Sequence, residues 1–313
     1  MEKKIFIISS NSGFFLYKCL FFLGWQFYDL REYTFPRKMD VYRKKNFLFK
    51  KKKLNFKFNY FTSSIRTFNY NKHTQTLDKI DPDPYQSWRD TNLNNFFSAI
   101  SKTTNKNKKT FIINKLFDSS FLNNKKNLIF YKKNYDLNKV FNLTLGSKFH
   151  LASCTGIDSI SYLQNIPTAY INGTLGLGFH SVSFSDKAIF CPLNIYSFKK
   201  KQILSLKEQI DLLRHLQKKF NIDRFEAKHQ KYYDIKYVQQ SYDEILNIII
   251  EIDKLSSGKN IMTKFDESLQ NKFWNIYPNK WFTVSKTCVF NKQFNKTILS
   301  PYFLRKHRKL YLN

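Results

Sequence analysis

The sequence predicts an α/β protein with a Rossmann-like, mostly parallel sheet flanked by helices. From Leu54 onward, short apolar runs alternate with amphipathic stretches, a rhythm typical of βαβ units. Hydrophobic residues make up 42% of the chain, which supplies enough apolar area for a packed core. The length of 313 residues fits one such domain plus a partial second one.

The amino-terminal segment is expected to hold a short strand at residues 5–8, a turn, and a helix from Phe14. A signal or anchor segment over residues 5–27 is disfavoured, because polar residues and Lys18 interrupt the apolar run, and a span needs about 20 nearly uncharged residues. A helix lying in the membrane interface stays open as an alternative. The basic run at residues 50–53 marks a boundary, so residues 1–53 are predicted to form a truncated amino-terminal segment with a basic linker.

Residues 54–283 are predicted to form the Rossmann-like domain, and residues 284–313 a helical tail. Ser241 and Glu244 form a capping box that begins a helix with one apolar face, and Gly258 ends it. The other expected helices lie at residues 93–102, 157–164 and 206–220. The expected strands lie at residues 55–61, 110–113, 128–131, 149–151, 168–171 and 188–190.

The chain carries 53 Lys and Arg against 23 Asp and Glu, a net charge of +30. Nucleic acid, an anionic membrane face, or a coding bias toward lysine would each account for this charge. The lysines are spread along the chain, which favours the coding bias. The four cysteines lie far apart and form no CxxC pair, which indicates reduced thiols in the cytoplasm and no structural zinc site.

A small polar loop joins the strand at residues 149–151 to the helix that follows it. Such a junction directs unpaired backbone N–H groups and the positive end of the helix dipole at the space above the sheet, which suits a phosphate. The alternative is that Thr155 and Asp158, three residues apart, cap their own helix. The candidate phosphate-binding residues are Ser153, Cys154, Thr155 and Gly156.

A glycine-bearing loop follows the next predicted strand and includes Asn172 and Gly173. Open α/β sheets bind ligands at the carboxyl ends of neighbouring strands, so this loop is a second candidate. Its GxGxG core lacks the spacing of the dinucleotide fingerprint and is by itself a weak signal.

Several blocks of this sequence occur in the same order in a known protein family. The main block is SKFHLASCTGIDSISYLQNIPTAYIN at residues 147–172, where that family has a loop of the form GTSSG. The others are YQSWRDTNLNNFFSAI at 85–100, ILSLKEQ at 203–209, YDIKYVQQSYDEILNIIIEID at 233–253, DESLQNKFW at 266–274 and ILSPYFLRKHRKLY at 298–311. In these blocks the chain resembles a family of glycosyltransferases from bacterial lipopolysaccharide and surface-polysaccharide gene clusters.

The resemblance implies a fold of two Rossmann-like domains, the GT-B type, whose carboxyl-terminal half binds a nucleotide-sugar donor. It implies donor diphosphate binding at Ser153, Cys154, Thr155 and Gly156. This chain departs from the family at Ala152, which replaces a glycine, and at Cys154, which replaces a serine. Its amino-terminal, acceptor-side half is also shorter than that of the family.

Two matched blocks supply further candidates for binding the donor sugar or nucleotide. Arg89 and Asp90 could contact phosphate or sugar, or form a surface ion pair at a helix start. Glu208 could accept from sugar hydroxyls, although Ser205 and Glu208 also have the spacing of a capping box, which we favour.

No metal or other cofactor is expected. Asp81 and Asp83 form a D-x-D sequence, but Pro82 and Pro84 hold it extended and no strand closely precedes it. His150 and His180 are the histidines nearest in sequence to the loop and are weak candidates for a catalytic base. No orienting carboxylate is visible for either histidine, which favours a packed or solvated role.

The resemblance therefore implies transfer of a sugar from a nucleotide-diphospho-sugar to a hydroxyl of a glycan or lipid-linked acceptor. The expected location is the cytoplasm, with peripheral contact at the inner face of an anionic membrane, and nucleic acid is not expected as a partner. The alternative is a noncatalytic remnant of the donor domain that uses its basic surface to bind membrane or nucleic acid.

Overall fold

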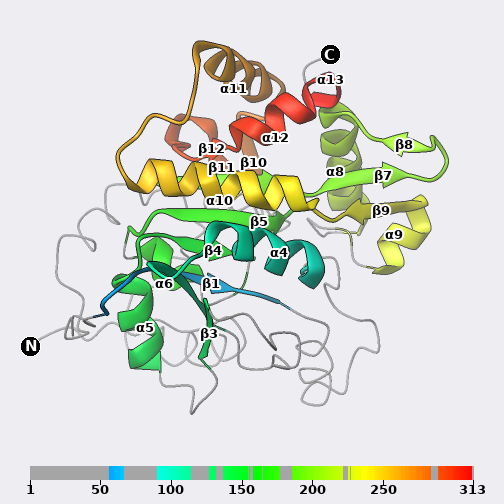
Figure 1. Ribbon diagram of the computed structural model, residues 1–313. Coiled ribbons are helices and arrows are strands. Elements are labelled where there is room, and N and C mark those ends of the chain that lie inside the picture. Colours follow the sequence, from blue (N-terminus) through cyan, green and yellow to red (C-terminus); the bar gives the residue numbers. More distant parts are fainter. Residues whose placement is uncertain are drawn as a thin grey trace, which may run out of the picture.

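The computed structural model describes residues 56–66, 90–113, 127–131, 137–153, 155, 158–163, 165–176, 185–220, 225, 227–282 and 288–311. Within these ranges the fold is α/β, with a central seven-stranded sheet and helices on both faces (Figure 1). The predicted Rossmann-like class is confirmed. The strand and helix expected within residues 5–27 lie outside the described residues.

The seven strands of the main sheet are all parallel and follow the order β12-β6-β5-β4-β1-β2-β3. The order reverses at β1, because β2 and β3 extend the sheet on one side and β4, β5 and β6 extend it on the other. The strands are β1 (Asn59–Ser64), β2 (Lys108–Ile113), β3 (Leu128–Tyr131), β4 (His150–Ala152), β5 (Thr168–Gly173), β6 (Ala188–Pro192) and β12 (Ile298–Leu299).

Alternation along β1 directs neighbouring side chains to opposite faces of the sheet. Phe61 joins the main core, which includes Phe96 and Phe97 of α4 (Leu93–Thr103). Tyr60 belongs to a smaller cluster that includes Leu143 of α5 (Leu137–Leu145). Helices therefore cover both faces, with α10 (Tyr242–Ser256) packed beside α4 and α6 (Asp158–Leu163) packed beside α5.

A smaller antiparallel sheet of order β8-β7-β9 follows the main strand β6 (Figure 1). It consists of β7 (Asn194–Ser197), β8 (Gln202–Ile203) and β9 (Ile235–Val238), with α8 (Leu206–Phe220) and α9 (Ala227–Tyr233) between β8 and β9. The carboxyl-terminal part holds α11 (Lys264–Ile276), the pair β10 (Lys280–Phe282) and β11 (Cys288–Asn291), η3 (Lys292–Phe294), α12 (Pro301–Lys306) and α13 (Arg308–Tyr311).

Most predicted elements are confirmed to within two residues at each end, and α8 and β3 match their predicted bounds. The helix predicted after Ser241 is α10, and its capping box with Glu244 is formed in both directions. The first strand of the domain was predicted at residues 55–61, but β1 lies further along at Asn59–Ser64. Helices α5, α9 and α11, strands β10, β11 and β12, and the strands of the smaller sheet have no predicted counterpart.

The boundaries predicted at residues 53 and 283 stay predictions. The last segment does contain helices α12 and α13, but it also contributes β12, which pairs with β6 at the edge of the main sheet. Among the helices of the described residues, none combines the length and the apolar character needed to cross a bilayer.

Candidate functional site

The reversal of strand order places the carboxyl ends of β1 and β4 side by side. Open α/β sheets bind ligands at the carboxyl ends of the strands, at the point where the strand order reverses. Arg66, two residues past the end of β1, donates its backbone N–H to Ser153 Oγ at 3.1 Å, and Ser153 directly follows β4. Ser153, a predicted phosphate ligand, therefore lies at the expected edge, with its side chain fully buried.

The segment before α4 joins the same edge. Thr91 donates its backbone N–H to the carbonyl of Arg66 at 2.9 Å. The Arg66 Nε atom lies 3.8 Å from Asp90 Oδ1, and both side chains are largely buried. Asp90, predicted as a donor-binding residue, thus pairs with an arginine that the sequence reasoning missed.

The carboxyl end of β5 completes this edge. Asn172 Nδ2 donates to Thr91 Oγ1 at 3.0 Å, and the Asn172 backbone N–H donates to the side-chain oxygen of Gln240 at 3.2 Å. Asn172 has a φ of 57°, a left-handed conformation that asparagine tolerates better than most residues. Gly173, the last residue of β5, is buried next to it. Asp90, Ser153, Asn172 and Gly173, four predicted site residues, are therefore gathered at one sheet edge.

Thr155 uses its donors within the protein. Its backbone N–H donates to Asp158 Oδ2 at 2.5 Å and its hydroxyl donates to Asp158 Oδ1 at 3.1 Å. The pair is therefore joined as the capping alternative expects on the Asp158 side only, because the Asp158 backbone N–H donates to the Thr155 carbonyl at 3.2 Å and not to its hydroxyl. A carboxylate at the start of α6 satisfies donors of the loop and complements the helix dipole, as a bound phosphate would.

Asp158 is also the centre of a buried hydrogen-bond network. It accepts from the hydroxyl of Ser64 and lies 3.0 Å from His150 Nε2. The other ring nitrogen of His150 lies 2.9 Å from Thr62 Oγ1. His150 and Asp158 are 1% and 3% exposed, so these two side chains of the network are closed to solvent.

The expectation that His150 has no orienting carboxylate is wrong, because Asp158 holds its Nε2 atom. The two residues are eight positions apart, and only the turn from β4 into α6 brings them together. The run of small polar residues at the end of β1 is a sequence signal for the network, since Thr62, Ser63 and Ser64 are all buried. Buried hydroxyls need hydrogen-bond partners from neighbouring elements.

Glu208 lies at the start of α8, and its hydrogen bonds join it to Ser205 and Lys200 and not to the described residues that meet at this edge. It accepts from the backbone N–H and the hydroxyl of Ser205 at 2.7 and 2.8 Å, which confirms the favoured capping box. Its carboxylate also pairs with Lys200 at 2.5 Å, and these contacts lower the pKa of Glu208 to about 2.

The remaining candidates lie outside the described residues, and their roles stay predictions. They are Arg89, Cys154, Gly156, His180 and the D-x-D residues Asp81 and Asp83. Within the ranges that the structure describes, no three His, Cys, Asp or Glu side chains form a group suited to a metal ion.

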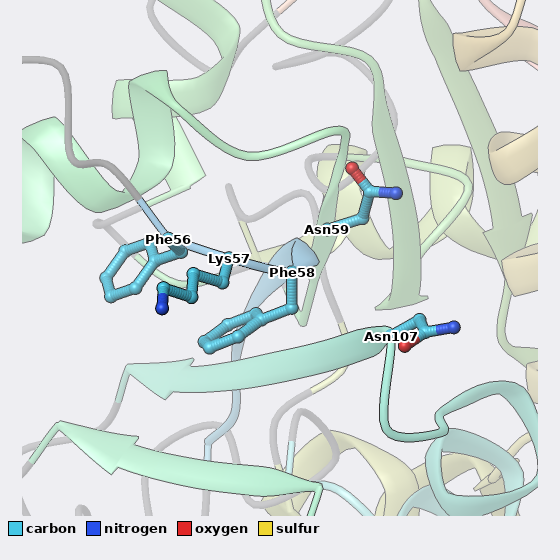
Figure 2. A pocket seen from close by; sticks show the side chains of 5 residues that line it. All are labelled: Phe56, Lys57, Phe58, Asn59 and Asn107. Carbon is cyan, nitrogen blue, oxygen red and sulfur yellow. The ribbon is translucent and has the colours of Figure 1, made fainter.

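A pocket of about 330 Å³ lies at the opposite, amino-terminal edge of the sheet. It is lined by residues 56–59, which lead into β1, and by Asn107, which precedes β2. Figure 2 shows the rings of Phe56 and Phe58 on one side and the amides of Asn59 and Asn107 on the other. This pocket does not include any of the predicted site residues.

Comparison of the chain with protein families, with curated proteins and with solved structures finds no match in any of the three.

Proposed function

We propose that this chain is a glycosyltransferase that binds a nucleotide-diphospho-sugar at the carboxyl edge of the main sheet. The sugar is then transferred to a hydroxyl of a glycan or lipid-linked acceptor at the cytoplasmic face of a membrane. The observation that best supports donor binding is the meeting of Asp90, Ser153 and Asn172 where the strand order reverses. The ordered sequence blocks that resemble the polysaccharide-cluster family supply the reaction class.

In this proposal Arg66 and Asp90 have complementary roles. Arg66 brings a permanent positive charge to the edge, and a guanidinium can neutralise the diphosphate that leaves as the bond to the sugar breaks. Asp90, whose Oδ1 lies 3.8 Å from Arg66 Nε, is the carboxylate of this edge that would accept from sugar hydroxyls. Ser153 positions the end of β4 against the segment after β1.

His150 and Asp158 are positioning residues in this scheme. They are buried and act through Thr155, whose backbone N–H and hydroxyl both donate to Asp158. The buried network therefore fixes the position of Thr155, next to which the diphosphate would lie. The catalytic base for the acceptor hydroxyl is not assigned to His150, since that side chain is 1% exposed.

The test is calorimetric titration of the full chain with UDP-, GDP- and ADP-sugars, and CMP-sugars, which carry one phosphate, serve as the comparison outside the proposed class. One nucleotide-sugar is expected to bind, and Arg66→Gln should weaken its affinity about 10- to 150-fold, the loss of a charge-assisted hydrogen bond worth about 1.5–3 kcal/mol. Thr155→Asp should also weaken binding, because it adds negative charge to the loop. Glu208→Gln is the control, since that carboxylate caps α8, and it should leave the affinity unchanged.

Release of nucleoside diphosphate that requires a lipid-linked acceptor, with the sugar recovered on that acceptor, would then establish transfer. Absence of binding across the panel by a chain that is folded by circular dichroism would contradict donor binding. Equal losses in Arg66→Gln and Glu208→Gln would contradict the location of the site.

A noncatalytic role is the second candidate, and Asp158 is the observation that favours it. Its carboxylate already accepts from both donors of Thr155, so the start of α6 carries its own anion. A chain that keeps the fold without the donor would act through its basic surface, on an anionic membrane or on nucleic acid. Binding of that kind falls steeply with ionic strength, whereas binding in a donor site falls much less.

A further inference from the structure

The turn between β7 and β8 presents an aromatic side chain and three consecutive lysines to solvent. Phe198 is 45% exposed, and Lys199, Lys200 and Lys201 are all exposed. In Figure 1 this turn projects from the right-hand side of the molecule, at the far end of the smaller sheet. Burying an exposed aromatic ring against a partner would remove apolar area from water. The lysines beside the ring favour a partner that is anionic.

The turn has a defined conformation. The Phe198 backbone N–H donates to the carbonyl of Asp234 at 2.9 Å, which joins the turn to the residue before β9. The Lys200 backbone N–H donates to Ser197 Oγ at 3.2 Å, and the Lys201 backbone N–H donates to the carbonyl of Phe198 at 3.3 Å. Phe198 is therefore held outward by the backbone of a hydrogen-bonded hairpin.

One face of the hairpin is both basic and aromatic. Tyr196 of β7 pairs with Lys236 of β9, and the Lys236 ammonium lies 5.4 Å from the Tyr196 ring and 5.3 Å from the Phe198 ring. The residues that alternate with them, Ile195 and Ile235, are buried in the main core. The smaller sheet thus buries its apolar face and exposes its cationic face to solvent.

Most of the charge at this face is not neutralised by the protein. Lys200 pairs with Glu208 at 2.5 Å, whereas Lys199, Lys201 and Lys236 form no ion pair with any residue that the structure describes. Besides Glu208, the exposed Asp234, which directly precedes β9, is an acidic residue close to the turn. The face therefore keeps a net positive charge around Phe198.

We propose that Phe198, Lys199, Lys201 and Lys236, the hairpin surface, dock the protein on an anionic bilayer. The lysines lie against headgroup phosphates, where each contributes about a fivefold gain in partitioning, and the Phe198 ring enters the interface. A projecting tip fits a flat bilayer, whereas single-stranded nucleic acid is bound in grooves that track its backbone. The proposal concerns a surface other than the donor site and holds whether or not a donor binds.

The first test measures partitioning of the full chain onto sedimented vesicles of phosphatidylcholine with 30% phosphatidylglycerol, at about 0.1 M salt. Lys199→Gln with Lys201→Gln should lower the partition coefficient about 30-fold, which corresponds to about 1 kcal/mol for each lysine. The matched control is Lys264→Gln with Lys272→Gln, two exposed lysines of α11, and it should change partitioning less than threefold. Melting curves confirm that both variants are folded.

The second test locates the contact. Phe198→Trp is compared with Phe265→Trp, which replaces a 50% exposed phenylalanine of α11. Vesicles that contain brominated lipid should quench fluorescence more strongly in Phe198→Trp than in Phe265→Trp or the wild type. Equal quenching in the two variants overturns the proposal. Equal loss of partitioning in the two lysine pairs also overturns it, as does a loss of oligonucleotide binding in the hairpin variant without any loss of vesicle binding.

Discussion

Replacing Asp158 by asparagine would test whether this carboxylate holds the β4 loop together. Asp158 accepts from four donors: the hydroxyl of Ser64, His150 Nε2, and the backbone N–H and hydroxyl of Thr155. These donors come from the end of β1, from β4 and from the loop itself. The substitution keeps the size and shape of the side chain but replaces one acceptor oxygen with an NH₂ group.

An amide oxygen accepts about two hydrogen bonds, so at least two of the four donors lose their acceptor. Each lost bond to a charged group costs about 1.5–3 kcal/mol, and the site is nearly inaccessible to compensating water. The expected loss in the free energy of unfolding is therefore about 3–6 kcal/mol, a large part of the stability of a typical domain. Urea denaturation followed by circular dichroism, with an unchanged m-value, measures this loss.

Asp243→Asn provides the matched control. Asp243 also lies in the first turn of a helix, α10, but it is exposed, so its loss removes only the favourable interaction with the helix dipole. That interaction is worth about 0.3–1 kcal/mol. If Asp158→Asn is no more destabilising than Asp243→Asn, Asp158 acts only as a first-turn charge and the network does not organise the loop.

Two further substitutions test the packing and electrostatics of the described core. A Cβ at Gly146 would lie 2.4 Å from the buried hydroxyl of Tyr60. Gly146→Ala should therefore lower the free energy of unfolding by about 1–3 kcal/mol. Adding Tyr60→Phe to this variant removes the hydroxyl and should restore most of the loss. Additive losses in this double-mutant cycle would contradict the clash. Burial raises the pKa of Glu251 to about 7, so the folded state holds this proton more strongly than the unfolded chain does. The bound proton therefore adds to the free energy of unfolding at low pH, and this contribution is lost as the pH rises from about 4.5 through 7. The wild type should therefore lose about 3 kcal/mol relative to Glu251→Gln over this interval, measured by urea denaturation at each pH, and parallel stability curves would contradict the raised pKa.

The sequence by itself determined the elements whose signals are local. Helix α8 has an apolar face that repeats with helical periodicity, and α10 begins with the capping box of Ser241 and Glu244, so both could be placed from neighbouring residues alone. The strand, loop and helix around Ser153 were likewise visible, because an apolar run gives way to small polar residues before the helix begins. These signals also indicated the α/β class.

Tertiary structure decided the properties that depend on pairing between distant segments. Strand β1 lies later than predicted because its register is fixed by β2 and β4, and its final residues are buried hydroxyls whose partners come from elsewhere in the chain. The smaller sheet pairs β7 with β9 across about 40 residues, and neither strand has a strong local pattern. The contact of His150 with Asp158 and the meeting of Arg66 with Asp90 are of the same kind. Local chemistry determined which segments could form strands and helices. The strand order determines which side chains meet at the carboxyl edge. That order depends on how the whole chain buries its apolar surface.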